Sequence, residues 1–355
     1  MAIFVDRMAR LKRSGRKAGV DAFFVNSEPN MRYLAGFSVS GMERFAGLVV
    51  PVNERKAMVI VPKLEEHKVK EQSAFKDIRS YDDSESPAHL LRQTIADAEL
   101  EEAVFGVEWT LPFRFYRMIA ECSSKITVRE VSTLFSQLRC LKSQDELKKM
   151  EKAANIVAKG IKAGIDFIKP GATEVSISFE IEKTIREKGG ESVPFCIVLA
   201  GSRSAMPHGG TSSNKVKEKD IVLMDVGAVY EGYYADLTRT VFVGNVTKKQ
   251  KEVYDIVAKA QEGAINMVRP NVRAEQVDDA TRKTIQDAGY GDFFTHRTGH
   301  GLGMEVHEEP YISKDNRTAL EPGMTFTVEP GIYLPGKFGV RIEDDIVVRR
   351  KVEDY

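Results

Sequence analysis

The pattern of apolar and polar positions changes character near residue 140. Before that point, short apolar runs alternate with amphipathic stretches. They predict a basic helix at about 4–18, a further strand-like stretch at 31–37, and strands at 21–25, 46–52, 57–62, 103–108 and 126–131. The strands 46–52 and 57–62 should form a hairpin. Strands mixed with helices in this way predict an α/β domain, residues 1–140, with a mixed sheet covered by helices.

After residue 140 the pattern becomes helical over longer stretches. Ser143 and Glu146 have the spacing of a capping box, and apolar residues then recur at helical spacing up to Ile168. Pro170-Gly171 should end that helix, and Thr173 should begin a second one that runs to Gly189-Gly190. These signals predict a second domain, residues 141–355.

An internal repeat runs through this second region. The sequence IVAK at 156–159 recurs at 256–259, and Ile165 and Pro170 recur as Ile265 and Pro270, always a hundred residues on. A constant offset over more than thirty positions favours a duplicated unit over chance. Two copies predict a domain with pseudo-twofold symmetry.

Between the repeated helix pairs lies a predicted hairpin, residues 221–243, whose arms are rich in Val, Leu, Thr and Tyr. Each arm carries one aspartate, Asp225 and Asp236. A loop at 230–231 would place them directly opposite each other, and a loop at 231–232 would place them on a diagonal. Either register puts both carboxylates on one face, so one must be protonated or a cation must lie between them.

The repeat predicts an equivalent hairpin near the end of the chain. One arm, MTFTVEPGIYL, contains Glu329, and the returning arm, GVRIEDDIVV, contains Glu343. A loop of three or five residues centred on Gly336 would pair the two glutamates on one face. Folded about the pseudo-twofold, the two hairpins would bring four acids into one cavity.

Between these hairpins lies the glycine-rich segment HRTGHGLGMEVHEEP, residues 296–310. His300 stands between Gly299 and Gly301, a poor place for a core histidine. Four carboxylates and one imidazole suit two divalent ions with oxygen-rich shells better than a structural zinc site, which prefers thiolates and histidines.

Composition narrows the class of protein further. Lys+Arg and Asp+Glu each number 52, so the zero net charge argues against a nucleic-acid binder. The charged N-terminal stretch lacks a signal-peptide core, and no apolar run has the length of a membrane helix. Three scattered cysteines, Cys122, Cys140 and Cys196, fit buried structural thiols in a reducing cytosol. We therefore expect a cytoplasmic protein without a membrane partner.

The chain resembles the pita-bread metallopeptidases, which include Xaa-Pro dipeptidases (prolidases), Xaa-Pro aminopeptidases and methionine aminopeptidases. Archaeal and bacterial prolidases are the most similar group. The resemblance rests on the motifs AGSRSAMPHG (200–209), MDVGAVYEGYYADLTRT (224–240), HRTGHGLGMEVHE (296–308), VEPGIYLPG (328–336) and VRIEDD (340–345). It implies an α+β fold: a creatinase-type N-terminal α/β domain, then a pseudo-twofold pita-bread domain with a curved, mainly antiparallel sheet covered by helices.

By resemblance, Asp225 chelates one ion, His300 and Glu329 hold the second, and Asp236 and Glu343 bridge both, with a hydroxide shared between ions roughly 3.5–4 Å apart. Glu329 is then the general acid/base. The favoured ions are Mn²⁺ or Co²⁺, and Zn²⁺ or Fe²⁺ would also suit this shell.

Other residues match family positions around the substrate. His208 and His307 would touch substrate and steady the tetrahedral intermediate. Arg341 would either orient a ligand carboxylate or meet the carboxylate of the substrate. Tyr333 would be a donor behind the ligands, and His296 would line the pocket. Two interpretations of Arg203 stay open: it contacts the substrate, or it is a solvated arginine in a loop.

The resemblance implies a dipeptidase that cleaves the bond before a C-terminal proline, and a homodimer. The nearest rival is an Xaa-Pro aminopeptidase acting on longer peptides. Methionine aminopeptidases are less similar because they do not need a domain like residues 1–140. A non-catalytic peptide binder on this fold is a third reading, and such proteins tend to lose the metal ligands that this chain keeps.

Overall fold

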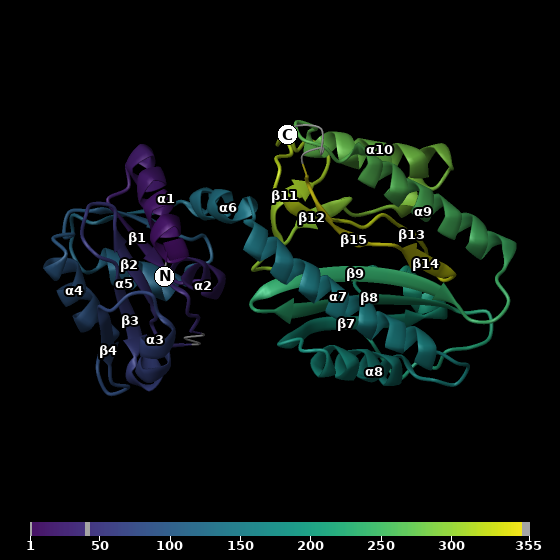
Figure 1. Ribbon diagram of the computed structural model, residues 1–355, viewed down its shortest axis with the longest axis horizontal. Coiled ribbons are helices and arrows are strands. Elements are labelled where there is room, and N and C mark those ends of the chain that lie inside the picture. The colour runs from purple at the N-terminus through teal and green to yellow at the C-terminus, as the bar shows by residue number, and fades with distance from the viewer. Residues whose placement is uncertain (1, 40–42, 350–355) are drawn as a thin grey trace. The chain divides into compact units, whose positions relative to one another are not determined.

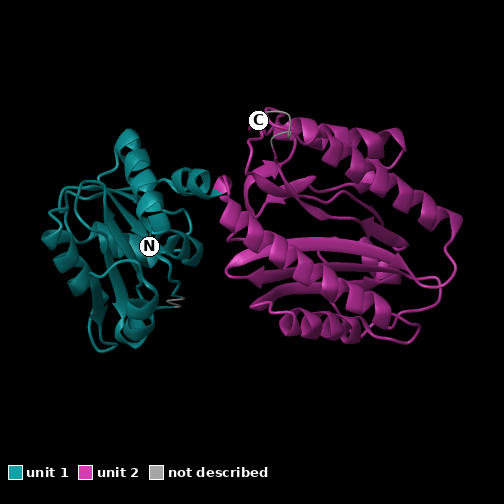
Figure 2. Cartoon of the chain, viewed as in Figure 1, with its two compact units in different colours: residues 1–139 teal, residues 140–355 magenta. Residues whose placement is uncertain are grey.

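Internal packing divides the chain into two units, Met1–Arg139 and Cys140–Tyr355 (Figure 2). The computed structural model describes residues 2–39 and 43–349. Among these residues, no helix combines the length and the apolar character needed to cross a lipid bilayer.

The first unit is built on a six-stranded sheet in the order β4-β3-β2-β1-β5-β6. The predicted hairpin is present as the antiparallel pair β2 and β3, and β1 pairs in parallel with β5, so the prediction of a mixed sheet is confirmed. The strands are β1 (Ala22–Val25), β2 (Gly47–Pro51), β3 (Met58–Pro62), β4 (Ile78–Tyr81), β5 (Val104–Val107) and β6 (Thr127–Glu130).

Helices accompany this sheet. They are α1 (Ala2–Ala18), α2 (Glu28–Ala35), α3 (Glu66–Gln72), α4 (Pro87–Asp97), α5 (Phe113–Ala120) and α6 (Ser132–Cys140). The prediction of a strand at 31–37 is wrong, because α2 occupies most of that stretch. Pro29 stands in the first turn of α2, where its missing N–H costs nothing, and Gly36 ends the helix in the left-handed conformation, with φ 83°.

The first half of the second unit packs two helices against a three-stranded antiparallel sheet (Figure 1). Its elements are α7 (Gln144–Phe167), α8 (Glu174–Glu187), β7 (Ser192–Ala200), β8 (Ile221–Tyr230) and β9 (Tyr233–Phe242). The predicted capping box at Ser143 is present, and Thr173 caps α8 in the same way. One apolar core, with Ile156, Ile181 and Met224 fully buried, holds these elements together.

The second half repeats this plan with a more divided sheet. Helices α9 (Lys248–Met267) and α10 (Ala274–Asp287) lie outside strands β10 (Gly299–Gly301), β11 (Glu308–Ile312), β12 (Thr325–Val328), β13 (Gly331–Leu334), β14 (Phe338–Arg341) and β15 (Asp344–Val347) (Figure 1). The strands form the sheet β11-β10-β12-β15 and the pair β13-β14, and every pairing is antiparallel. Val253, Ile285 and Phe326 are among the buried residues under these helices.

The internal repeat predicted from the sequence is confirmed in the backbone. Helix α10 begins and ends a hundred residues after α8, and the turns before the two helices match as well. Gly171 and Asn271 both have left-handed conformations, with φ 91° and 69°. Two copies of one helix pair, each covering strands, define a pseudo-twofold α+β domain of the pita-bread type.

Candidate active site and metal centre

The turn between β8 and β9 decides which of the two predicted registers holds. Tyr230 pairs with Tyr233, so the loop is Glu231-Gly232. Both loop residues have positive φ, 46° and 79°, as the two-residue turns that fit the twist of a hairpin require. The diagonal arrangement of the two aspartates is therefore the one observed.

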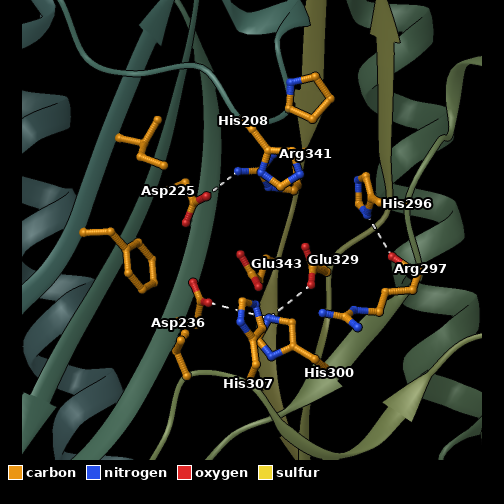
Figure 3. Close-up of a pocket in the computed structure, with 14 residues that line it drawn as sticks. His208, Asp225, Asp236, His296, Arg297, His300, His307, Glu329, Arg341 and Glu343 are labelled. Carbon is orange, nitrogen blue, oxygen red and sulfur yellow. Dashed lines mark hydrogen bonds and ion pairs between the residues drawn. The ribbon is translucent and has the colours of Figure 1, made fainter. Parts of the chain in front are cut away.

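Within this register Asp225 lies opposite Thr238, and Asp236 lies opposite Gly227. Positions 225 and 227 share a face of β8, so both carboxylates point the same way, into a common cavity (Figure 3). Asp236 is 5% exposed. The hairpin thus buries one acid and holds a second beside it.

The second predicted hairpin has the expected register but not the expected continuity. Gly331 pairs with Arg341 and Val328 pairs with Asp344, which agrees with a three-residue turn around Gly336. Each arm, however, is divided into two strands, and the divisions fall at Glu329-Pro330 and at Ile342-Glu343. Two continuous arms were expected, and that expectation is wrong because Pro330 has no N–H to give to a ladder.

The two glutamates in these gaps bond to other segments. The backbone N–H of Glu329 donates to the carbonyl of Thr298 at 2.8 Å, and that of Glu343 donates to the carbonyl of Thr238 at 3.1 Å. Glu329 is thereby fixed beside the segment that leads to β10, and Glu343 is fixed beside β9 in the other half of the unit. The gaps therefore place both acids at the meeting point of the two halves.

His300 occupies the middle of the short strand β10. A Cβ at Gly299 would lie 1.8 Å from the carbonyl oxygen of Thr327, so only glycine allows this approach. The Nδ1 of His300 lies 3.1 Å from the carbonyl oxygen of Gly301, which can only accept, so Nδ1 carries the proton. The lone pair of Nε2 then faces Asp236 Oδ2 at 3.8 Å and Glu329 Oε1 at 3.4 Å (Figure 3).

The acids around His300 would be stabilised in their charged forms by a nearby positive charge. Burial, and then the charge of Glu343, raise the pKa of Asp236 well above its usual range. Burial raises the pKa of Glu329 to about 7 and, with the charge of Glu329, raises that of Glu343. Burial lowers the pKa of His300 to about 3, so its imidazole is neutral. Two buried acids, a largely buried third acid and a neutral imidazole cannot neutralise one another.

The same residues fit metal ions by geometry. One ligand atom each from Asp236, His300 and Glu343 lies within 4.8 Å of the others. Asp236 Oδ1 is buried and has no hydrogen-bond partner among the described residues, so an oxygen is left for a ligand that the protein itself does not supply. Carboxylates and imidazole are ligands for Mn²⁺, Co²⁺, Fe²⁺ and Zn²⁺. The donor set therefore fits divalent metal ions.

Two threonines support the glutamates from behind. Thr238 donates its hydroxyl to Glu343 Oε2 at 2.5 Å, and Thr327 donates to Glu329 Oε1 at 3.1 Å. Both side chains are fully buried. The sequence analysis missed them, although Thr238 stands two residues after Asp236 and must share its face of the strand.

Arg341 is held by three neighbours. Its guanidinium pairs with Asp225 and donates to the hydroxyls of Thr238 and Tyr333, at 3.1 and 3.0 Å. Tyr333 in turn donates to Nε2 of His296 at 2.8 Å, because Nδ1 of His296 must donate to a carbonyl oxygen. Burial lowers the pKa of His296 to about 4, which keeps the ring neutral. These residues form a chain of bonds that ends on Asp225.

The four acids, His296, His300 and Arg341 line one cavity of about 520 Å³. The structure brings together every sequence-predicted site residue except Tyr333, which lies behind the wall on Arg341. The lining residues are Phe195, Ile197, Pro207, His208, Asp225, Asp236, His296, Arg297, His300, Val306, His307, Glu329, Arg341 and Glu343.

The two remaining predicted histidines lie at the exposed side of this cavity. His307 places its ring edge-on to His300, with centroids 4.2 Å apart, and His208 follows the short helix η2 (Gly201–Ala205). Arg203, whose part the sequence left open, does not line the cavity. It pairs with buried Glu174 and donates to the carbonyl of Gly210, so it fixes both ends of the loop that carries His208.

The cysteines take no part in this site. All three are free thiols. Cys140 is buried, whereas Cys122 and Cys196 are half-buried, so the prediction of three buried thiols is confirmed for Cys140 alone. Burial raises the pKa of Cys140 and Cys122 to about 11 and that of Cys196 to about 12. The thiols therefore stay protonated near neutral pH, as structural cysteines do.

The fold and this acid-lined cavity define a class of protein, and comparison with known families agrees. Residues 148–350 match metallopeptidase family M24, and residues 7–141 match the creatinase/prolidase N-terminal domain. The chain belongs to metallopeptidase family M24.

Individual members of the family are similar over nearly the whole chain. The Xaa-Pro dipeptidase of Pyrococcus horikoshii is 34% identical, over 99% of this chain and 96% of that protein. The crystal structure of a recombinant prolidase from Thermococcus sibiricus is 38% identical, with a TM-score of 0.93, and covers 98% of this chain and 95% of that one. An X-Pro aminopeptidase from Thermotoga maritima is 33% identical, with a TM-score of 0.87, over 97% and 95% of the two chains.

Proposed function

We propose that this protein is an Xaa-Pro dipeptidase, which hydrolyses the peptide bond before a C-terminal proline with the help of two divalent metal ions. The observation that carries the proposal is the cavity in which Asp236, Glu329 and Glu343 converge on His300 with one buried carboxylate oxygen left over. The similarity to a dipeptidase and a prolidase over at least 95% of each chain supports the substrate class.

Five residues would hold the ions: Asp225, Asp236, His300, Glu329 and Glu343. The bound ions would supply an activated water at neutral pH and would polarise the scissile carbonyl. Asp236 and Glu343 come from opposite halves of the unit, so both halves would take part in holding the ions. Mn²⁺ or Co²⁺ is our first expectation, and Zn²⁺ or Fe²⁺ would also fit the donors.

The protein's own groups would then move protons and orient the substrate. Glu329 would accept a proton from the attacking water and pass it to the proline nitrogen as the bond breaks. His208 and His307, on the exposed side of the cavity, would hold the substrate and face the oxygen on which negative charge develops. Arg341 would hold the carboxylate of Asp225 in place, because its donors are directed to Asp225, Thr238 and Tyr333.

The wall beside the aspartates would supply shape. Phe195 and Ile197 from β7 are half-buried and line the cavity together with Pro207 and Val306. Apolar groups next to a polar centre exclude water from the reacting atoms and offer contact to a proline ring. Tyr333 would orient His296, which lies on the opposite side of the cavity from the aspartates (Figure 3).

Release of proline from Met-Pro or Gly-Pro tests the proposal directly. The purified protein is treated with EDTA, each metal is added back separately, and free proline is measured. We expect activity only after metal is restored. Absence of turnover with every metal and with several Xaa-Pro dipeptides would contradict it.

The nearest alternative is an Xaa-Pro aminopeptidase, and the similarity to the Thermotoga maritima enzyme is the observation that keeps it in view. The comparison of Gly-Pro with Gly-Pro-Ala separates the two, since an aminopeptidase accepts the longer peptide. A non-catalytic peptide binder would hold less than one metal ion per chain after reconstitution, and metal analysis would reveal it.

The organisation around this site is also a proposal. We take residues 1–140 as the creatinase-like domain and residues 141–355 as the peptidase domain. A homodimer in the cytoplasm, without nucleic-acid or membrane partners, is the expected setting. Gel filtration with light scattering tests the dimer.

A further inference from the structure

One positively charged residue of the cavity, Arg297, has no role in the proposed mechanism. Arg297 lies between His296 and strand β10, is half-buried, and extends its guanidinium toward the carboxylates (Figure 3). Within the part of the chain that the structure describes, that guanidinium makes no hydrogen bond and no ion pair. An arginine that lines a partly open cavity with its donors unused is available to bind a ligand.

The aromatic ring of Tyr311 holds this side chain in place. The guanidinium carbon lies 4.3 Å from the centroid of the ring, a distance typical of a cation–π contact. A guanidinium stacked on a ring keeps its N–H edges free for in-plane hydrogen bonds. Tyr311 therefore restrains Arg297 without consuming its donors, as a preformed binding group requires.

The other arginine of the cavity is already occupied. Arg341 is 4% exposed and pairs with Asp225 while it donates to two hydroxyls. Three of the five N–H groups of its guanidinium are directed to these partners, which favours the orienting role over a contact with substrate. Arg297, by contrast, lines the same cavity with its guanidinium over the ring of Tyr311.

We propose that Arg297, stacked on Tyr311, binds the C-terminal carboxylate of the substrate and so makes the enzyme selective for dipeptides. The inference rests on the proposed Xaa-Pro activity and adds the group that recognises the chain end. The carboxylate would accept two parallel N–H bonds from the guanidinium, the arrangement that matches both groups. In a tripeptide the carboxylate lies one residue, roughly 3.5 Å, farther along the chain and loses this partner.

The test compares a substrate with its uncharged analogue. Hydrolysis of Met-Pro and of Met-Pro amide is measured for the native protein and for Arg297→Met and Arg297→Lys, each loaded with the metal that gives the highest activity. Loss of a charge-assisted hydrogen-bonded pair should lower kcat/KM of Arg297→Met for Met-Pro by about 10- to 100-fold. Its kcat/KM for the amide should stay within about threefold of the native value, because the amide never made the ion pair.

The lysine variant and a surface control sharpen this result. Arg297→Lys keeps the charge but loses the paired donors, so its activity on Met-Pro should fall between those of the native protein and Arg297→Met. Arg269→Met removes an exposed arginine from the turn between α9 and α10, and it should leave kcat/KM unchanged for both substrates. Metal content is measured for each protein, because Arg297 lies near the metal ligands.

Two outcomes would overturn the inference alone. Equal losses on Met-Pro and on the amide in Arg297→Met would show that the arginine balances the acidic cluster instead of binding the chain end. Equal hydrolysis of acid and amide by the native protein would show that no group recognises the carboxylate. Failure of the native protein on Met-Pro, the amide and Gly-Pro-Ala with every metal would instead overturn the proposed function, and this inference with it.

Discussion

In the first hairpin, β8 and β9 run for ten residues each and carry their aspartates inside the ladder. In the second, both arms stop where Glu329 and Glu343 stand. The aspartates are placed by the regular pairing of β8 with β9, and the N–H of Asp236 donates to Asp345 Oδ2 at 3.1 Å. The glutamates lie outside strands and donate their N–H groups to the carbonyls of Thr298 and Thr238. The unbroken hairpin makes a rigid wall, and the interrupted one joins that wall to the rest of the site.

The hydroxyls of Thr238 and Thr327 play the same part in the two halves: each donates to one of the glutamates. Thr238, inside β9, accepts a bond from Arg341 and donates to Glu343. Thr327, inside β12, accepts from the backbone N–H of His300 and donates to Glu329. In each half a threonine on a regular strand orients a glutamate that stands outside one. Side chains on the regular strands thus fix the positions of the glutamates that lie between strands.

The largest effect should come from removing one acid from each hairpin. Asp236→Asn and Glu343→Gln should each lower kcat/KM on Met-Pro by about a thousandfold or more, since metal activation contributes several kcal/mol to the reaction. Metal content per chain should fall in both. Asp279→Asn, on the exposed face of α10, is the control. A large loss in only one of the two variants would mean that the halves do not share the ions.

The next prediction concerns the close approach of β10 to β12. Gly299→Ala places a Cβ 1.8 Å from the carbonyl oxygen of Thr327, so the two strands must separate. We expect a loss of about 3 kcal/mol in the free energy of unfolding, the upper end for overpacking. Gly263→Ala, in α9 with nothing within 4 Å, should instead gain up to about 1 kcal/mol. Urea denaturation measures both, and equal values would refute the assigned cause.

Removal of each supporting hydroxyl should have a smaller effect. Thr238→Val and Thr327→Val keep the volume of the side chain but leave Glu343 or Glu329 without its donor. Loss of such partners typically costs about 10- to 100-fold in metal affinity or activity. Metal titration followed by proline release measures this. Loss in Thr238→Val alone would show that the two threonines are not equivalent.

The smallest effects should come from the turns. Gly232 and Gly336 close the two hairpins and have φ 79° and 70°. Alanine at either position should cost about 1–2 kcal/mol of unfolding free energy, because both backbones are left-handed. Thermal or urea denaturation should give similar values for the two variants. A clear difference would show that the interrupted arms transmit turn strain differently from the continuous ones.

Much of this architecture could be predicted from the sequence because several signals are local. The capping box at Ser143, the cap at Thr173 and the constant offset between repeats all follow from residue identity and spacing. The apolar arms and the paired acids located the cavity. The choice between two registers of the first hairpin needed the structure, because Tyr230, Glu231 and Gly232 allow either loop.

Other features depend on contacts that spacing does not reveal. The helix Glu28–Ala35 looked like a strand because Met31, Tyr33 and Leu34 are apolar, although Ser27 followed by Pro29 is a helix-start signal that could have been used. The gaps at Glu329 and Glu343 are fixed by partners far away in sequence. Arg297 lies within the glycine-rich segment 296–310. The sequence does not show that the donors of its guanidinium are unused while those of Arg341 are bonded to neighbouring side chains.

The bond from the Glu343 N–H to Thr238 links the two halves of the second unit at the place where their acids meet. An ion held there would act as a clamp that exists in the folded chain and is lost on unfolding. Mass action then ties folding to metal supply: an ion present at a hundred times its dissociation constant would add about 2.7 kcal/mol. A melting curve recorded with each metal in turn would therefore rank the ions that this protein prefers, before any peptide is added.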